Sequence, residues 1–337
     1  MNPPPRSAGN NRRVAPETTA QTQELAAQVR DGDRRAVARA ITLVESTRAD
    51  HRAEAIALLN ELLPHTGRAI RVGISGAPGA GKSTLIDALG SHLVEQGHEV
   101  AVLAVDPSSA RSGGSVLGDK TRMGSLGRSP NAYIRPSPSG GTLGGVARRT
   151  GESLLVCEAA GFDIVLVETV GVGQSETEVD AIVDAFVLLV APGAGDELQG
   201  IKRGITEMAD IVVVTKADGD LAASARHVAA EYQRALMLLR HQHEEWEPTV
   251  VLTRGITGDG ISDVADAIAR HHDALDATGA LTRRRAAQAT RALWAELQDR
   301  LVAKFRDDPE LQAKVTELEA QVAAGRLVPA AAVDELL

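Results

Sequence analysis

The spacing of hydrophobic residues divides this chain into three regions. In the first, residues 19–66, apolar side chains recur every three or four positions, and this spacing predicts helices. The expected helices are Thr19–Arg30, Arg34–Glu45 and Arg52–Leu63. Asp33 is placed to cap the second helix, whose Val37, Ile41 and Val44 face inward, and Pro64 ends the third.

From Gly67 the pattern changes to short, continuous, β-branched runs separated by helical segments. The expected strands are Ile70–Ser75, Val100–Val105, Ile164–Glu168, Phe186–Val190, Ile211–Thr215 and Thr249–Leu252. Runs of this kind are typical of a mostly parallel sheet that helices cover on both faces. In such an α/β fold the loops at the carboxyl ends of the strands carry the site.

After about His272 the pattern is helical again. Leu293, Leu297, Leu301 and Phe305 are spaced four apart and form an apolar stripe on one helix. Asp308-Pro309 opens a further helix, which ends before Gly325. The predicted organisation is a disordered tail at 1–18, an N-terminal helical segment at 19–66, the α/β domain at 67–272 and a C-terminal helical arm at 273–337.

Composition narrows the choice of partners. The 337 residues carry a formal net charge of −9, and the longest basic run is Arg283-Arg284-Arg285, which argues against nucleic acid as the main partner. No apolar stretch is long enough to cross a membrane and no hydrophobic signal core is present, so we expect no membrane insertion and a cytoplasmic location. The single cysteine, Cys157, lies in an apolar helical stretch and is expected to be a packed thiol.

A glycine-rich segment follows the first expected strand. Gly76-Ala77-Pro78-Gly79-Ala80-Gly81-Lys82-Ser83 fits the pattern G-x-x-x-x-G-K-[ST], and Thr84 continues into a helix. Its glycines let backbone N–H groups converge on phosphates, Lys82 can reach the β and γ oxygens, and the Ser83 hydroxyl can ligate Mg²⁺. The strand before the segment and the helix after it argue against a chance turn. The chain is therefore expected to bind a nucleoside triphosphate.

Two further strand ends carry acids. Asp106 opens a long loop that contains Asp119 and Lys120, and such a loop beside a P-loop suggests a switch whose carboxylates approach Mg²⁺ or its waters. An ordinary surface loop is the alternative. Glu168 at the next strand tip, with Gly171 three residues later, resembles a Walker B and switch II pattern, in which the acid acts on the metal or its water and the glycine N–H senses the γ-phosphate.

The segment Thr215-Lys216-Ala217-Asp218 ends another strand and predicts the base. A carboxylate there can accept from the N1–H and N2–H₂ groups of guanine, whereas adenine offers no matching donors, so GTP is favoured over ATP. The usual pattern has Asn where this chain has Thr215. A solvated Lys and Asp at a strand end is the alternative. Four of the six lysines, Lys82, Lys120, Lys202 and Lys216, lie in these loops, which supports a functional role for them.

Long loop motifs give a family resemblance. They are Asp106-Pro-Ser-Ser with Gly118-Asp-Lys-Thr-Arg-Met123, Glu168-Thr-Val-Gly-Val-Gly-Gln-Ser-Glu176 and Gly193-Ala-Gly-Asp-Glu-Leu-Gln-Gly-Ile-Lys202. The chain closely resembles the MeaB/ArgK-type GTPases along most of its length. The resemblance implies a homodimeric P-loop GTPase of the SIMIBI type that binds GTP, GDP and Mg²⁺. It also implies a chaperone that gates adenosylcobalamin loading and protects methylmalonyl-CoA mutase.

The resemblance assigns roles by position. Phosphate and Mg²⁺ are held by Lys82, Ser83 and Thr84, while Asp106, Asp119 and Glu168 surround the metal and the attacking water. Guanine contacts fall on Lys216 and Asp218, with Thr215, Arg254 and Gly255 in segments that depart from the usual pattern. The expected catalytic residues are Lys82, Asp119 and Glu168, and the expected switch residues are Asp119, Lys120, Gln174, Asp196 and Lys202.

Slow intrinsic hydrolysis is expected, because Val172 stands where some GTPases place a water-orienting Gln. Gln174 and Arg122 are reserve candidates for a catalytic role.

Three alternative functions remain open. They are a kinase of a basic amino-acid transport system, a metal-insertion GTPase and an interaction module with negligible hydrolysis. Metal insertion usually needs a metal-holding cluster, whereas His241, His243, His271 and His272 fall in polar stretches and are expected to be solvated.

Overall fold

The computed structural model describes residues 19–106, 123–138, 143–169, 175–192, 203–239, 243–254 and 257–336. The chain divides into two compact units between Thr282 and Arg283. The first unit contains a sheet and its covering helices, and the second contains the last helices of the chain. The domain limits predicted from the sequence remain predictions, and the tail at residues 1–18 lies outside the described residues.

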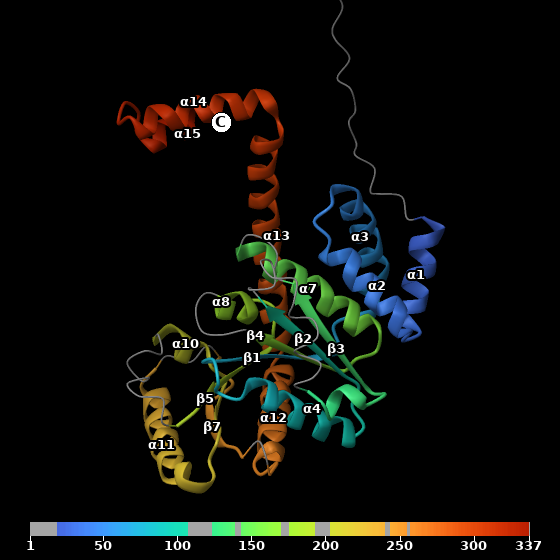
Figure 1. The fold of residues 1–337 in the computed structure, drawn as a ribbon, viewed down its shortest axis with the longest axis vertical. Coiled ribbons are helices and arrows are strands. Elements are labelled where there is room, and N and C mark those ends of the chain that lie inside the picture. Colours follow the sequence, from blue (N-terminus) through green and yellow to red (C-terminus); the bar gives the residue numbers. More distant parts are fainter. Residues whose placement is uncertain are drawn as a thin grey trace, which may run out of the picture. The chain divides into compact units, whose positions relative to one another are not determined.

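The first unit is built on a seven-stranded parallel sheet with the strand order β3-β2-β4-β1-β5-β6-β7 (Figure 1). The strands are β1 (Ile70–Gly76), β2 (Val100–Asp106), β3 (Ala132–Pro138), β4 (Ile164–Thr169), β5 (Ala185–Val190), β6 (Ile211–Val214) and β7 (Thr249–Leu252). This confirms the predicted α/β fold with a parallel sheet, and six strands lie within one residue of their expected ends.

The seventh strand, β3, was not predicted. It pairs with β2 along its full length, from Ala132 opposite Val100 to Pro138 opposite Asp106. Its two prolines lower strand propensity and cannot donate to a ladder, so its sequence does not read as a strand. As an edge strand β3 needs hydrogen bonds on one side only, and this position tolerates prolines.

Hydrophobic cores lie on both faces of the sheet. Along β4 the side chains alternate, with Val165 and Val167 in one core and Ile164 and Leu166 in the other. The first core reaches α7 (Leu143–Ala159) and α11 (Ala222–Leu238) and continues into the N-terminal helices, while the second reaches α4 (Lys82–Glu95) and α12 (Ile261–Ala277). The helices that follow the N-terminal segment are α4 (Lys82–Glu95), α7 (Leu143–Ala159), α8 (Ser175–Asp180), α10 (Arg203–Met208), α11 (Ala222–Leu238) and α12 (Ile261–Ala277).

Cys157 on α7 lies in the first core and is fully buried, as the sequence predicts. Burial raises the pKa of its thiol, because a thiolate there would lose its hydration. The side chain therefore acts as a small hydrophobic residue and not as a nucleophile.

From residue 19 onward, the helices before the sheet are α1 (Ala20–Arg30), α2 (Arg34–Glu45) and α3 (Ala49–Leu62), and a 3₁₀ turn, η1 (Leu63–His65), follows them. The predicted bounds of α2 are confirmed. The Asp33 side chain accepts from Ala36 N at 2.7 Å, which is the cap that the sequence predicts. The third helix was predicted to begin at Arg52, and this is wrong by three residues.

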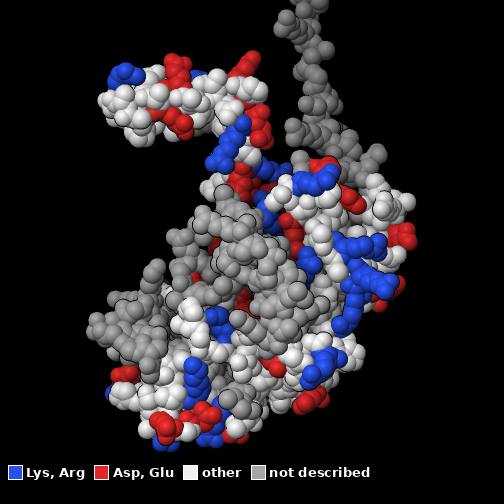
Figure 2. Space-filling view, viewed as in Figure 1, with Lys and Arg blue, Asp and Glu red and all other residues white. Residues whose placement is uncertain are grey.

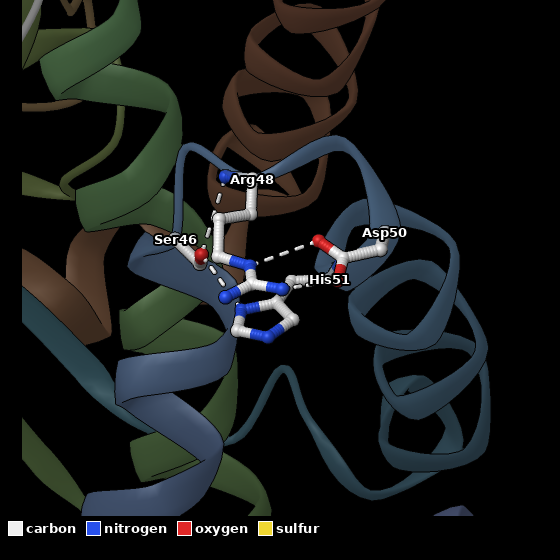
Figure 3. A network of polar contacts seen from close by, with 4 residues as sticks. All are labelled: Ser46, Arg48, Asp50 and His51. Atoms are coloured by element: carbon white, nitrogen blue, oxygen red, sulfur yellow. Dashed lines mark hydrogen bonds and ion pairs between the residues drawn. The ribbon is translucent and has the colours of Figure 1, made fainter.

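The early start of α3 follows from a polar network at its first turn (Figure 3). Arg48, the residue before the helix, binds Asp50 with two parallel hydrogen bonds, from Nε to Oδ1 at 3.0 Å and from a terminal nitrogen to Oδ2 at 2.6 Å. Ser46 accepts from Arg48 N and pairs with His51 Nδ1 at 2.8 Å. The Arg48 hydrogen bond lowers the pKa of Asp50 to about 2, so this carboxylate stays charged beside the helix N-terminus.

Basic side chains gather over α1 and α2, shown in blue in Figure 2. Arg34, the first residue of α2, donates to the carbonyl of Ala132 at the start of β3, at 2.7 Å, and to the carbonyl of Pro130 just before that strand. On the same strand Arg135 pairs with Glu45 at 2.6 Å. These contacts attach the N-terminal helices to the edge strand of the sheet.

Aspartates occupy the amino ends of three strands. Asp163, Asp184 and Asp210 each stand one residue before a strand, and each accepts a hydrogen bond from a backbone N–H of another segment. The donors are Glu99 N at 2.9 Å, Arg71 N at 2.9 Å and Phe186 N at 2.8 Å, respectively. A carboxylate satisfies donors that the ladder leaves unpaired, so these residues have a structural role at this edge.

The second unit is helical. It contains most of α13 (Ala280–Asp307), then α14 (Pro309–Ala323) and α15 (Pro329–Leu336). Asp308 caps α14 through bonds to Glu310 N and Leu311 N, as the sequence predicts. The three leucines of the stripe on α13 are exposed, with Leu293 at 66% and Leu301 at 50%, while Phe305 is half-buried. Among the described residues, none of the helices is both long and apolar enough to cross a membrane.

Candidate nucleotide-binding site

The glycine-rich loop lies between β1, near the middle of the sheet, and α4. A Cβ on Gly76 would stand 2.6 Å from the carbonyl oxygen of Leu189 on the neighbouring strand β5, so only glycine fits there. Gly81 has a φ of 97° at the N-cap of α4, a left-handed conformation that favours glycine. The loop therefore presents the N-terminus of α4 at the carboxyl edge of the sheet, where backbone N–H groups can bind an anion.

Lys82 begins α4 and is buried, with 8% of its surface exposed. Its Nζ donates to the carbonyl oxygens of Gly76, at 2.7 Å, and of Ala77, at 3.2 Å. Burial lowers the pKa of Lys82, while Glu168 and Glu176 oppose that shift. A buried ammonium ion that contacts only neutral carbonyls is stabilised when an anion lies nearby, and a phosphate group can be that anion.

Ser83 and Glu168 bring a hydroxyl and a carboxylate together. The Ser83 hydroxyl donates to Glu168 Oε1 at 3.0 Å, and Glu168 is largely buried near the end of β4. Next to them the Thr169 hydroxyl donates to the hydroxyl of Ser75 on β1 at 2.9 Å. A hydroxyl and a carboxylate are hard oxygen ligands, so this pair fits a hydrated Mg²⁺ beside phosphates.

The expected base-reading segment lies at the end of β6. The buried Thr215 hydroxyl donates to the carbonyl of Ala80 in the glycine-rich loop at 2.7 Å, so the residue that replaces the usual Asn ties the two segments together. Lys216 has a φ of 54°, the only positive value at a non-glycine among the described residues. This conformation costs energy in an L-residue and is typical of functional loops. Asp218 is partly exposed and precedes the turn η3 (Gly219–Leu221).

Arg254 supports this segment from the loop after β7. Its Nε donates to the carbonyl of Ala217 at 3.0 Å, and a terminal nitrogen binds Asp259 at 2.7 Å. Two hydrogen bonds lower the pKa of Asp259: the one from Arg254 contributes most and the one from Thr257 contributes less. The residue thus positions the backbone between Lys216 and Asp218.

Several predicted site residues lie outside the described residues. They are Asp119, Lys120, Gly171, Gln174, Asp196, Lys202 and Gly255, together with the reserve candidate Arg122. Of Asp106 only the backbone is described, at the end of β2. The structure therefore brings together Gly76 to Thr84, Glu168 and Thr215 at one edge of the sheet.

Sequence analysis assigned no role to Glu176, which is 1% exposed at the start of α8 and acts on the charge of Lys82. Its place in the motif that begins at Glu168 is the signal that could have found it. The expectation about the histidines is wrong for two of them. His271 is fully buried and the His243 side chain is only 11% exposed, whereas both were expected to be solvated.

A parallel sheet that carries G-x-x-x-x-G-K-[ST] between its central strand and a helix defines the class of P-loop nucleotide-binding proteins. Residues 37–310 match the family model described as methylmalonyl Co-A mutase-associated GTPase MeaB. The chain belongs to this family, and it is a P-loop GTPase. The resemblance of its loop motifs to this family is thereby confirmed.

Similar proteins occur in bacteria and animals. A GTPase of Caulobacter vibrioides is 56% identical over 306 residues, which cover 91% of this chain and 94% of that protein. The methylmalonic aciduria type A homolog, mitochondrial, of Mus musculus is 49% identical over 91% of this chain and 76% of its own length. The chain also aligns with the crystal structure of a LAO/AO transport system kinase. The alignment covers 95% of this chain and 97% of the kinase chain, with 36% identity and a TM-score of 0.77.

Proposed function

We propose that this chain is a GTP-hydrolysing chaperone of adenosylcobalamin-dependent methylmalonyl-CoA mutase, which gates cofactor loading and protects the mutase from inactivation. The family match carries the proposal, because it covers residues 37–310 and names the mutase as the associated enzyme. The mitochondrial methylmalonic aciduria type A relative supports the same connection. The expected cytoplasmic location of this chain stays a prediction.

Hydrolysis rests on positioning and on neutralising charge. Lys82, already held at the loop carbonyls, binds the β- and γ-phosphates as a point charge. Ser83 and Glu168 would hold a magnesium ion, which would neutralise the charge that develops on the phosphate oxygens. The proposal assigns the orientation of the attacking water to Glu168 and Asp119. The proposed intrinsic rate is slow, and the partner stimulates it.

Guanine selectivity is assigned to Asp218, with Lys216 and Arg254 in support. If the Asp218 carboxylate accepts from guanine N1–H and N2–H₂, Asp218→Asn replaces an acceptor with a donor and shifts preference from GTP toward XTP. Competition binding of GTP, XTP and ATP measures this shift. Asp220→Asn, on the next turn, is the matched control and should leave the preference for GTP unchanged. Equal binding of ATP and GTP by the wild type would contradict the assignment.

The proposed chaperone role is tested with γ-labelled GTP and purified mutase. We expect free labelled phosphate from the chain alone and faster release when the mutase is added. Equal rates with and without the mutase would contradict the partner assignment while leaving the GTPase intact. If an unrelated cobalamin enzyme stimulates GTP hydrolysis to the same extent, the chain is not specific for the mutase.

A kinase of a basic amino-acid transport system is the second candidate, and the similarity to the LAO/AO transport system kinase favours it. A kinase would transfer the label to a protein, whereas a GTPase releases it as phosphate. The same experiment separates them, since labelled protein after electrophoresis would favour the kinase. Binding of GTP with neither product would favour an interaction module.

The communication between nucleotide and mutase is assigned to the switch residues Asp119, Lys120, Gln174, Asp196 and Lys202, which lie outside the described residues. Asp196→Ala and Lys202→Ala are expected to keep GTP affinity and lose stimulation by the mutase. We also propose that the chain forms a homodimer. The exposed leucines on α13 offer an apolar surface for a second copy, and sedimentation of the full chain measures the assembly state.

A further inference from the structure

Asp210, His243 and His271 form a cluster at the amino edge of the sheet. Asp210 directly precedes β6, His243 follows α11 at the approach to β7, and His271 lies on α12. One carboxylate oxygen and one ring nitrogen of each histidine all lie within 4.8 Å of one another. The three residues come from distant parts of the sequence, so no sequence motif predicts the cluster.

The geometry suits a shared ion. His271 Nε2 lies 3.5 Å from Asp210 Oδ1, and His243 Nε2 lies 4.0 Å from the same oxygen. The two imidazole rings stand 5.9 Å apart at 70° to each other. In a tetrahedral site with bonds of about 2.0–2.1 Å, neighbouring ligand atoms are roughly 3.3–3.5 Å apart. The Asp210–His271 pair already has this spacing, and the other two pairs must close from 4.0 Å and from at most 4.8 Å.

His271 carries the strongest signal. Its surface is fully buried, and neither of its ring nitrogens has a hydrogen-bond partner among the described residues. Buried polar groups are nearly always hydrogen-bonded, so an imidazole in this state requires an explanation. A metal bond at Nε2 supplies an interaction for the nitrogen that faces Asp210 Oδ1.

The structural role of Asp210 does not account for the cluster. Its Oδ2 accepts from Phe186 N, the same role that Asp163 and Asp184 perform at the neighbouring strands. Oδ1 instead faces two imidazoles. At Asp163 the second oxygen binds a single, partly exposed histidine, His98, at 2.8 Å. Two buried or nearly buried histidines around one oxygen distinguish Asp210 from that simple pair.

Trp246 forms one wall of the cluster. Its ring packs edge-on against His271 with centroids 5.2 Å apart, and its Nε1 donates to the backbone carbonyl of Asp210 at 2.9 Å. An apolar wall limits access of water and strengthens bonds between a cation and its ligands. Trp246 also provides a spectroscopic reporter beside the proposed ion.

We propose that Asp210, His243 and His271 bind a divalent transition-metal ion, with Zn²⁺ as the best match, at the edge of the sheet opposite the nucleotide. Two imidazoles and one carboxylate are ligands of intermediate softness that suit zinc and not magnesium. The fourth position is open to water. The bound ion joins β6, the segment before β7, and α12, and so stabilises this edge of the fold.

The test uses the full chain after removal of metal by a chelator, with Mg²⁺ and GDP at saturation so that the nucleotide site is filled. Zinc is titrated by calorimetry. We expect one Zn²⁺ per chain, and His243→Ala should weaken it at least ~100-fold, because loss of an outer-shell partner alone costs ~10- to 100-fold. Asp210→Asn keeps an oxygen for Phe186 N and should also weaken zinc.

His227→Ala is the matched control, because His227 is exposed on α11 and pairs with Glu231 away from the cluster. A second readout uses cobalt. In a Trp294→Phe background Trp246 is the only tryptophan, and Co²⁺ should quench its fluorescence in the wild type but not in His243→Ala. Circular dichroism checks that each variant is folded.

Absence of saturable zinc binding by the wild type, or equal affinity in the wild type and His243→Ala, would overturn the proposal. Weakening by His227→Ala to the same extent would show adventitious surface binding and would overturn it as well. GTP binding should be unchanged in His243→Ala, so a failure here is distinguishable from a failure of the nucleotide site.

Discussion

The two ends of β6 differ in how their sites are built. At the carboxyl end, Thr215 binds a carbonyl of a loop whose shape depends on glycines and whose functional groups are largely backbone N–H donors. At the amino end, Asp210 meets two histidines, and every proposed ligand is a side chain. A strand of four residues spans only about 13 Å, so two sites of different chemistry can share one short strand.

The difference determines how each site responds to substitution. At the carboxyl end a substitution that fills the space of a loop glycine should cost stability, whereas at the amino end the removal of one side chain should be enough to abolish the proposed ion site.

Gly76→Ala should have the largest effect on stability. The new Cβ would lie 2.6 Å from a backbone carbonyl that cannot move without disturbing β5, so we expect a loss of about 2–4 kcal/mol in the free energy of unfolding. Urea denaturation measures it. Gly124→Ala is the control, because no atom lies within 4 Å of the added carbon. Equal stability of the two variants would show that a Cβ can be accommodated at position 76.

Lys82→Ala should weaken GTP without unfolding the chain. It removes a charge-assisted contact of about 1.5–3 kcal/mol, which corresponds to at least ~10-fold in affinity. Calorimetry with GTP and Mg²⁺ measures the loss, and Lys304→Ala on α13 serves as the control. Zinc affinity should not change. Unaltered GTP affinity would contradict the assignment of the loop.

The carboxyl edge of the sheet is easier to predict from the sequence than the amino edge, for a physical reason. A P-loop needs consecutive residues, so Gly76 to Ser83 is visible as one motif. The cluster at Asp210 needs residues that only the folded sheet brings together, and a histidine in a polar stretch gives no sign of burial. The edge strand β3 was missed because Pro136 and Pro138 are compatible with a strand only at an edge, a position that local sequence does not reveal.

Thr215→Val should have a moderate effect on the carboxyl edge. It removes the hydrogen bond to the Ala80 carbonyl at similar side-chain volume, so we expect a loss of about 0.5–1.5 kcal/mol in stability and a weaker hold on the loop. Thr215→Ser keeps the hydroxyl and should behave like the wild type. Thermal unfolding of the three proteins compares them. If Val and Ser substitutions are equivalent, the hydroxyl does not connect the two segments.

The smallest effect is expected at Asp50, whose carboxylate is exposed. Its pKa is lowered to about 2 in the folded chain, so the Arg48 pair stabilises the fold above the unfolded pKa of about 3.9, and this contribution is lost as pH falls through about 2. Solvent screens the pair, so Asp50→Asn should change stability little at neutral pH. Urea denaturation at neutral and acidic pH compares it with Asp210→Asn, which we expect to be more destabilising.

Release of phosphate from GTP tests the central claim most directly. The wild type and Glu168→Gln are compared with Mg²⁺ and with GTP high enough to saturate both. We expect the wild type to hydrolyse GTP and the variant to bind GTP while releasing phosphate ~10²-fold more slowly, because it lacks the carboxylate beside Ser83. Equal rates in the two proteins would contradict a catalytic site at the carboxyl ends of β1 and β4.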